Sequence, residues 1–179
     1  MGNKLTQKEI NKIIKNHKHW LNEDIDGWNN MKADFFYQDL RGASLRYANL
    51  SDVDLRDVDL SGTKNINIPM ACPEEGSFIG FKKAVNADKA YIIKLEISAD
   101  ALRSSATSRK CRCNKAKVLE IQNIDGSKAN IDVVHSTYNP SFQYKTGQIV
   151  EEPKFDNNRF NECSKGIHFF INRQEAVDY

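Results

Sequence analysis

The residues ADFFYQDLRGASLRYANLSDVDLRDVDLSG, numbers 33 to 62, repeat with a period of five. A large apolar residue recurs at every fifth position, and a small or apolar residue usually stands two positions before it. Aspartate or asparagine directly precedes most of the large residues, whereas Gln38 and Ser44 depart from the pattern. A fixed short period of this kind indicates stacked turns of a repeat architecture. The large residues are Phe35, Leu40, Leu45, Leu50, Leu55 and Leu60.

The motif of Ala, then Asp or Asn, then Leu and two variable residues resembles the pentapeptide-repeat family. That resemblance implies a right-handed β-helix in which four pentapeptides form a coil and the central Leu or Phe points inward. Residues 33–64 would fill only about one and a half coils, and so short a solenoid leaves its ends uncovered. We therefore expect the repeat to act as a dimerisation or docking module. It is too short to imitate a DNA duplex.

Residues 1–32 are expected to form an N-terminal helix and a linker. Thr6 and Glu9 have the spacing of a capping box, and apolar residues then recur at helical spacing. The sequence therefore predicts a helix from about residue 6 to residue 21.

Two polar features near the end of this helix could suggest metal binding. His17 and His19 lie where the helix dipole favours positive charge, so a favourable helix end is the preferred interpretation. The acidic run 22–27 imitates the beginning of a calcium loop, but Ala33 stands where that loop needs a glutamate. We therefore expect a solvated turn.

Residues 65–179 are expected to form a C-terminal β-rich α+β domain. Alternation of apolar and polar residues predicts strands, which are followed by a last strand, IHFFI, and a terminal helix. The whole chain is thus predicted to be α+β and β-rich: an N-terminal helix, a short right-handed β-helix segment of pentapeptide repeats, and a mixed β-rich globular domain. The first three predicted strands of that domain are 77–84, 91–98 and 117–124.

Composition limits the class of protein. The formal net charge is only +2, although 28% of the residues are charged, so the molecule is no general binder of polyanions. No segment approaches the roughly 18 apolar residues of a membrane span, and the N-terminus lacks the apolar core of a signal peptide. We expect a cytoplasmic protein, in the host cell cytoplasm if a phage encodes it, with no membrane and no specific nucleic acid as partner.

The cysteines could supply soft metal ligands. Cys111 and Cys113, with Cys163 and either Cys72 or His168, would make a set of four, but their spacing is not that of structural zinc sites. Buried reduced thiols are the preferred interpretation. No Gly-rich phosphate loop, zinc-protease motif or nucleophile elbow occurs either. We assign no metal, no cofactor and no catalytic residue.

The segment RSSATSRKCRCNKAK, residues 103–117, contains six basic residues, four hydroxyls and no carboxylate. Arginines bind phosphate oxygens bidentately, and serine or threonine hydroxyls donate to anions. The segment is therefore a candidate anion site, although a polar loop that enters an edge strand is an equally simple interpretation. The candidate ligand-binding residues are Arg103, Ser104, Ser105, Thr107, Arg109 and Arg112.

Further candidates for the same site lie later in the chain. Phe142 or Tyr144 could stack on a nucleotide base, and Arg159 and His168 could contact the ligand. These four residues are chosen by residue type alone.

Residues 72–84, 103–122 and 160–179 resemble the C-terminal domain of uncharacterised phage and prophage proteins that also carry a short pentapeptide-repeat leader. The resemblance covers nearly the whole chain and implies no activity. The segment from Gly166 to Tyr179 is also similar to the glycine, strand and helix arrangement of some ADP-ribosyltransferase-like domains, which bind NAD. A partner for the catalytic glutamate of those domains is missing.

These observations favour a phage-type protein that binds a phosphorylated nucleotide and sequesters it. The ligand would be an ADP-ribose-derived or cyclic immune signal, and the protein, expected to be a homo-oligomer, would act as an anti-defence sponge. Two alternatives stay open. One is an enzyme that processes the nucleotide or transfers ADP-ribose, and the other is an adaptor that binds proteins through the repeat.

Overall fold

The computed structural model describes residues 2–179, which divide into two compact units. The first unit contains the chain up to Pro69 together with Ala106–Ser108. The second contains Met70–Ser105 and Arg109–Tyr179. Among the described residues, no helix combines the length and the apolar character that a membrane crossing requires.

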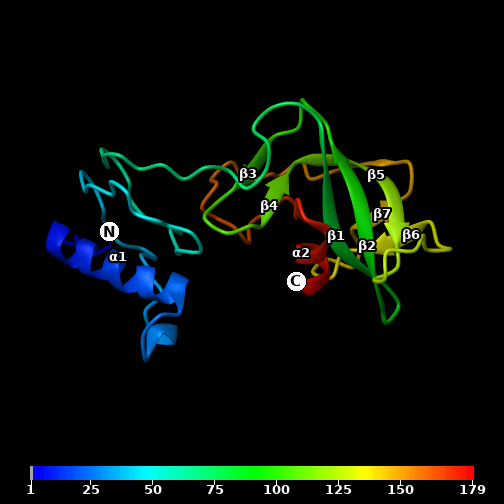
Figure 1. The fold of residues 1–179 in the computed structure, drawn as a ribbon. Coiled ribbons are helices and arrows are strands. Elements are labelled where there is room, and N and C mark those ends of the chain that lie inside the picture. Colours follow the sequence, from blue (N-terminus) through cyan, green and yellow to red (C-terminus); the bar gives the residue numbers. More distant parts are fainter. Residues whose placement is uncertain (1) are drawn as a thin grey trace. The chain divides into compact units, whose positions relative to one another are not determined.

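The first unit begins with helix α1 (Gln7–Asn22), which confirms the helix predicted from the sequence (Figure 1). The Thr6 side chain accepts a hydrogen bond from the backbone N–H of Glu9, and the Glu9 carboxylate accepts one from the Thr6 N–H. This capping box satisfies donors that the first turn leaves unpaired. The helix ends at Glu23, which adopts a left-handed conformation with φ of 53°. A short 3₁₀ helix, η1 (Trp28–Asn30), follows.

Histidine 17 links the helix to the repeat. The His17 ring is fully buried; its Nε2 lies 2.9 Å from the carbonyl oxygen of Ser51, and its Nδ1 lies 3.2 Å from the Ala33 N–H. Because the amide of Ala33 can only donate, Nδ1 must accept and Nε2 must carry the hydrogen. Burial lowers the pKa of His17, which favours this neutral form.

The repeat buries its large apolar residues, as the period of five predicts. Parallel bridges join residues twenty positions apart, as in Asp34 with Asp54 and Ser44 with Lys64. The bridges are isolated, however, and no strand is formed between residues 33 and 64. The segment is therefore no extended solenoid, because too few repeats are present to stack several coils. The buried large residues are Phe35, Leu40, Leu45, Leu50 and Leu55.

The second unit is built on an open antiparallel sheet, whose longest strands form the β1–β2 hairpin (Figure 1). Three strands predicted from the sequence are confirmed with ends shifted by one or two residues. In the described part of the chain, the six strands in spatial order are β7 (Gln143–Lys145), β6 (Val133–His135), β1 (Phe78–Asn86), β2 (Lys89–Ile97), β5 (Lys115–Gln122) and β8 (Ile149–Glu151).

A smaller antiparallel sheet has the order β3 (Arg103–Ser105), β4 (Cys111–Cys113) and β9 (Ile167–Phe169). It joins the larger sheet through a bridge between Phe81 and Phe170, whose amides and carbonyls exchange hydrogen bonds of 2.7 and 2.8 Å. Gly80 allows this close approach, because a Cβ added there would lie 2.6 Å from the Phe169 ring.

The two faces of the larger sheet carry different residues. The main core of the unit contains Tyr91, Ile93, Leu95 and Ile97, the alternating positions of β2 that the sequence places on one face. On the opposite face, Ile92 and Phe170 pack with Ala176 of the terminal helix α2 (Arg173–Asp178). β2 therefore has apolar packing along one face and, at Ile92, on the opposite face as well.

Candidate functional site

A cavity of about 360 Å³, which we name the Lys82 cavity, lies within the second unit. This volume suits a small organic ligand. The lining includes lysines, one glutamate, one histidine and four aromatic rings among the described residues, and it draws on β1, β7, β9, the segment after β8 and the chain terminus. The lining residues are Lys82, Lys110, Ser136, Tyr138, Asn139, Phe142, Tyr144, Glu152, Cys163, Ser164, Lys165, Gly166, His168 and Tyr179.

Lysine 82 is the most unusual of these residues. It alternates with buried Gly80 and Ala84 along β1, so it points to the core side of the sheet and is only 7% exposed. Within residues 2–179, Lys82 has neither a hydrogen bond nor an ion pair, and its Nζ lies 5.9 Å from the centre of the Tyr144 ring. Burial lowers the pKa of Lys82 to about 8. An amine in such a place is poised to receive an anion or to react as a base.

Lysine 110 brings a second amine to the cavity. Its Nζ lies 3.3 Å from the Cys163 sulfur and 5.5 Å from the centre of the Tyr179 ring. Burial alone would lower the pKa of Lys110, but the Cys163 thiol and the neighbouring Tyr179 together raise it. Lys110 therefore stays charged near neutral pH, and it adds to the positive potential of the cavity.

Histidine 168, a sequence-predicted ligand residue, does line the cavity. Its Nε2 lies 3.1 Å from the carbonyl oxygen of Glu162, which can only accept, so Nε2 carries the hydrogen and Nδ1 keeps a lone pair. Burial, together with the charges of Lys82 and Lys110, lowers the pKa of His168 to about 4. The ring is therefore neutral at pH 7 and serves as a polar contact rather than a cation.

Aromatic rings form another part of the cavity lining. The rings of Phe142 and Tyr144, both predicted ligand residues, lie 5.2 Å apart at an angle of 51°. The hydroxyls of Tyr138 and Tyr179 lie 3.4 Å apart, and both residues are more than half exposed. Tyr144 is only 2% exposed, whereas the exposed rings of Tyr138 and Tyr179 can stack on a nucleotide base.

The arginines of the predicted anion site have structural partners instead. Arg103 donates to a series of backbone carbonyls, including those of Gly76 and Ser98 at 2.7 Å. Arg109 forms an ion pair of 2.8 Å with Glu175 of α2. None of the predicted arginines lines the Lys82 cavity. Their role in ligand binding stays a prediction.

Arginine 112 is buried and anchors a loop. Its guanidinium donates to the carbonyls of Asp156, Asn158 and Lys165 at 2.8 to 3.1 Å, and it lies over the Phe155 ring. Burial lowers the pKa of Arg112, but a guanidinium stays charged at any physiological pH. The loop that it holds carries Cys163 to Gly166 into the cavity wall. Arg112 thus positions a wall of the cavity through the loop carbonyls, although it does not line the cavity itself.

Most of the remaining predicted residues are also engaged elsewhere. The Ser105 hydroxyl accepts from the Ala71 N–H at 2.8 Å, and Arg159 donates to the Ser105 carbonyl at 2.8 Å. Ser104 differs, because its buried hydroxyl has no hydrogen-bond partner within residues 2–179. Thr107 belongs to the first unit, where its hydroxyl donates to the Val53 carbonyl at 2.6 Å.

Three of the four cysteines are buried free thiols, as the sequence interpretation expected, and the fourth is exposed. Cys111 and Cys113 lie on β4 and are fully buried, as is most of Cys72, whereas Cys163 is exposed. Burial raises the pKa of Cys113 to about 12, so its thiol stays protonated. No group of three or more possible metal ligands occurs among residues 2–179.

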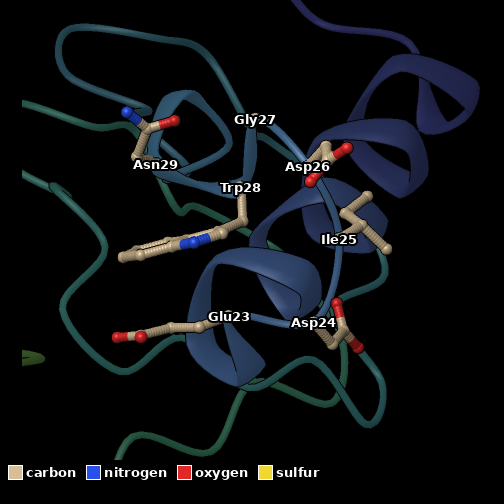
Figure 2. A pocket seen from close by; sticks show the side chains of 7 residues that line it. All are labelled: Glu23, Asp24, Ile25, Asp26, Gly27, Trp28 and Asn29. Carbon is tan, nitrogen blue, oxygen red and sulfur yellow. The ribbon is translucent and has the colours of Figure 1, made fainter.

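A second hollow lies in the first unit and is lined by residues 23–29, which follow α1 in the sequence. Figure 2 shows the Glu23 carboxylate extending beside the Trp28 ring, away from Asp24 and Asp26. Asp24 instead accepts from His19 at 2.7 Å. The carboxylates do not converge, which agrees with the solvated turn expected from the sequence.

Comparison with known proteins defines the family. Residues 68–176 match a family model described as a family of unknown function (DUF5758), and residues 33–64 match pentapeptide repeats. An uncharacterized protein of Acanthamoeba polyphaga mimivirus is 38% identical over 96 residues, which is 49% of this chain and 61% of that protein. The chain thus matches less than two thirds of that relative. This match to one viral protein does not test the predicted origin in a phage or prophage, which stays a prediction.

No solved structure matches the chain. The family match covers most of the second unit, including nearly all of the residues that line the Lys82 cavity. The chain therefore belongs to the DUF5758 family and carries pentapeptide repeats ahead of the family domain.

Proposed function

We propose that this protein binds a small phosphorylated nucleotide in the Lys82 cavity and sequesters it. The observation that supports the proposal most directly is the state of Lys82. Its amine is nearly buried, opens into a cavity and lacks an acidic partner among the described residues. A buried ammonium without a counter-charge costs free energy, and a bound phosphate would supply that charge.

The rest of the lining supports the same ligand class. Among the described lining residues, three lysines face a single acid, Glu152, so the cavity favours an anion. The exposed rings of Tyr138 and Tyr179 offer surfaces for a base, and the neutral His168 offers a hydrogen-bond acceptor. A ligand with phosphate at one end and a planar ring at the other would use both parts of the lining.

Sequestration rather than turnover is favoured by the side chains that the cavity contains. The cavity contains amines, hydroxyls, the Glu152 carboxylate, the Cys163 thiol and a histidine whose pKa of about 4 makes it a weak base at pH 7, and we infer no nucleophile–base pair from this set. A protein that binds its ligand tightly without converting it lowers the free concentration of that ligand. This is the action expected of an anti-defence sponge directed at a nucleotide signal.

The test compares binding of ADP, ADP-ribose, cyclic dinucleotides and unphosphorylated adenosine by equilibrium dialysis. Wild-type protein should prefer phosphorylated compounds, and Lys82→Met should weaken their binding by about 10- to 100-fold. Lys83→Met is the matched control, because Lys83 is the next residue on β1 and faces the other side of the sheet.

Equal affinities for ADP in the two variants would refute the site. Mass spectrometry of the retained ligand separates the alternatives in function. Recovery of an intact compound supports sequestration, whereas a converted product supports the enzyme.

We also infer that the repeat adopts the beginning of a right-handed β-helix. Its bridges join residues twenty apart, which equals four pentapeptides for each coil, and its large residues point inward. Hydrogen bonds such as the one from the Leu40 N–H to the Asp59 carbonyl, at 3.0 Å, follow the same spacing.

A further inference from the structure

The position of Lys82 on its strand separates its aliphatic stem from its amine. Lys82 lies opposite Ile93 in the register of β1 and β2, and Gly80 and Ala84 flank it on the same face. These neighbours are apolar and buried, so the methylene groups of Lys82 continue the core. Only the end of the side chain reaches the cavity, which fixes where a reaction at Nζ would occur.

The surroundings of Nζ increase the fraction of the amine that is neutral, compared with an exposed lysine. Tyr144 from β7, Cys113 from β4, His168 from β9 and Lys110 face it, and Glu152 lines the same cavity. The first three are neutral at pH 7, because burial raises the pKa of both the tyrosine and the thiol and lowers that of the histidine. Lys110 disfavours a second positive charge beside it.

The lowered pKa of Lys82 increases the fraction of its amine that is neutral at pH 7. A lysine with a pKa of about 8 is roughly one-tenth neutral at pH 7. An ordinary lysine has a neutral fraction about 300-fold smaller at the same pH. The neutral amine is the nucleophile that attacks carbonyl carbon.

We propose that Lys82 captures its ligand covalently, by forming an imine with a phosphorylated sugar that carries a free aldehyde. This inference rests on the proposed function, because the phosphate brings the ligand into the Lys82 cavity. The Nζ lone pair forms a bond to the aldehyde carbon while the carbon–oxygen π pair moves to oxygen. A proton passes from nitrogen to that oxygen, water then leaves, and amine plus aldehyde have become imine plus water. No oxidant or reductant is required for this step.

The cavity supplies contacts for each part of such a ligand. The charged amine of Lys110 lies in the wall beside Lys82 and attracts the phosphate. The His168 Nδ1 lone pair can accept a hydrogen bond from a sugar hydroxyl. Nucleotides whose terminal ribose opens to an aldehyde combine all of these features.

The experiment uses the full chain with ADP-ribose, whose terminal ribose has an open-chain aldehyde form, and sodium cyanoborohydride to reduce any imine. Peptide mapping by mass spectrometry then gives the labelling rate of each lysine. We expect Lys82 to be labelled at least tenfold faster than Lys83, and excess ADP, which has no aldehyde, to suppress the labelling.

Lys82→Arg cannot form the reducible imine, so labelling should be lost from this position. Lys83→Arg should leave the labelling of Lys82 unchanged. If ADP binds and Lys82 is labelled no faster than Lys83, the imine is refuted and the nucleotide site stands. If Lys82 is labelled rapidly but ADP neither binds nor competes, the reactive amine stands and the nucleotide site is refuted.

Discussion

A single buried histidine connects the helix to the repeat in the first unit. His17 donates to Ser51 and accepts from Ala33, so His17→Ala would leave a backbone donor and a backbone acceptor without partners. We expect this substitution to lower the free energy of unfolding by about 1–3 kcal/mol. Both tryptophans, Trp20 and Trp28, lie in the first unit, so urea unfolding followed by tryptophan fluorescence reports on it specifically.

The effect of His17 should also depend on pH. Burial lowers the pKa of His17 in the folded chain, so the unfolded chain binds the proton more strongly. The stabilisation by His17 is therefore complete above about pH 6.5 and is lost as the pH falls from there through the folded-state pKa. His19→Gln is the control, because the His19 side chain pairs with exposed Asp24, and its effect should stay within about 0.5 kcal/mol. Equal effects of His17→Ala and His19→Gln on the free energy of unfolding would contradict the role of the His17 hydrogen bonds in joining the helix to the repeat.

The absence of a side chain at Gly80 is a requirement of packing rather than of backbone conformation. A Cβ would lie 2.6 Å from the Phe169 ring and 3.0 Å from the Ile97 side chain. Gly80→Ala should therefore cost about 1–3 kcal/mol in a urea titration followed by far-ultraviolet circular dichroism. In the Phe169→Leu background the same substitution should cost less, because the smaller side chain leaves room. If Gly80→Ala costs the same free energy of unfolding in both backgrounds, the Phe169 ring is not the source of the strain.

At the scale of elements, local sequence patterns were sufficient for part of the fold. The capping box of α1 and the alternation in β2 act through neighbours close in sequence, and both were predicted within two residues of their ends. The burial of Lys82 could not be predicted. One alternating row of β1 contains Gly80, Lys82 and Ala84, and the other contains Phe81, Lys83 and Val85. The second row is the more apolar of the two, so the pattern alone would place Lys83 inside.

The loop after β8 owes its shape to one buried arginine. Arg112 donates to three loop carbonyls between Asp156 and Lys165, and lysine cannot reach them with a planar fork of donors. Arg112→Lys should lower the free energy of unfolding by about 2–3 kcal/mol. Hydrogen–deuterium exchange should become faster in residues 155–166 of the free protein, and ADP should bind more weakly because these residues form a cavity wall.

Arg109→Lys is the matched control for this experiment, since it makes the same exchange three residues earlier. Arg109 pairs with Glu175 at an exposed site, so the substitution should cost less than about 1 kcal/mol and leave the loop unchanged. If Arg112→Lys instead preserves the protection of the loop and abolishes ADP binding, Arg112 contacts the ligand directly, as its residue type first indicated.

At the scale of the whole molecule, the candidate site could be predicted only in part. Three of the residues proposed from their type, Phe142, Tyr144 and His168, line the cavity of the C-terminal domain, and their contact with a ligand stays a prediction. The arginines of the basic segment 103–117 have partners within the chain, because a cluster of arginines in sequence can also satisfy backbone carbonyls, and their role in ligand binding stays a prediction. Whether a cationic side chain is available to a ligand depends on contacts between segments that are distant in sequence. One such contact is the hydrogen bond from Arg103 to the Gly76 carbonyl.

The chain returns briefly to the first unit after it has entered the second. Residues 106–108 come from the loop between β3 and β4 but belong to the first unit, where Thr107 bonds with Val53 and accepts from the Asp52 N–H at 3.1 Å. Thr107→Val should therefore destabilise the first unit by about 1 kcal/mol, measured by tryptophan fluorescence in urea. ADP affinity should stay unchanged, because Thr107 does not line the Lys82 cavity. A Thr107→Val protein with unchanged stability and weakened ADP binding would restore Thr107 as a ligand residue and move the binding site toward the basic segment.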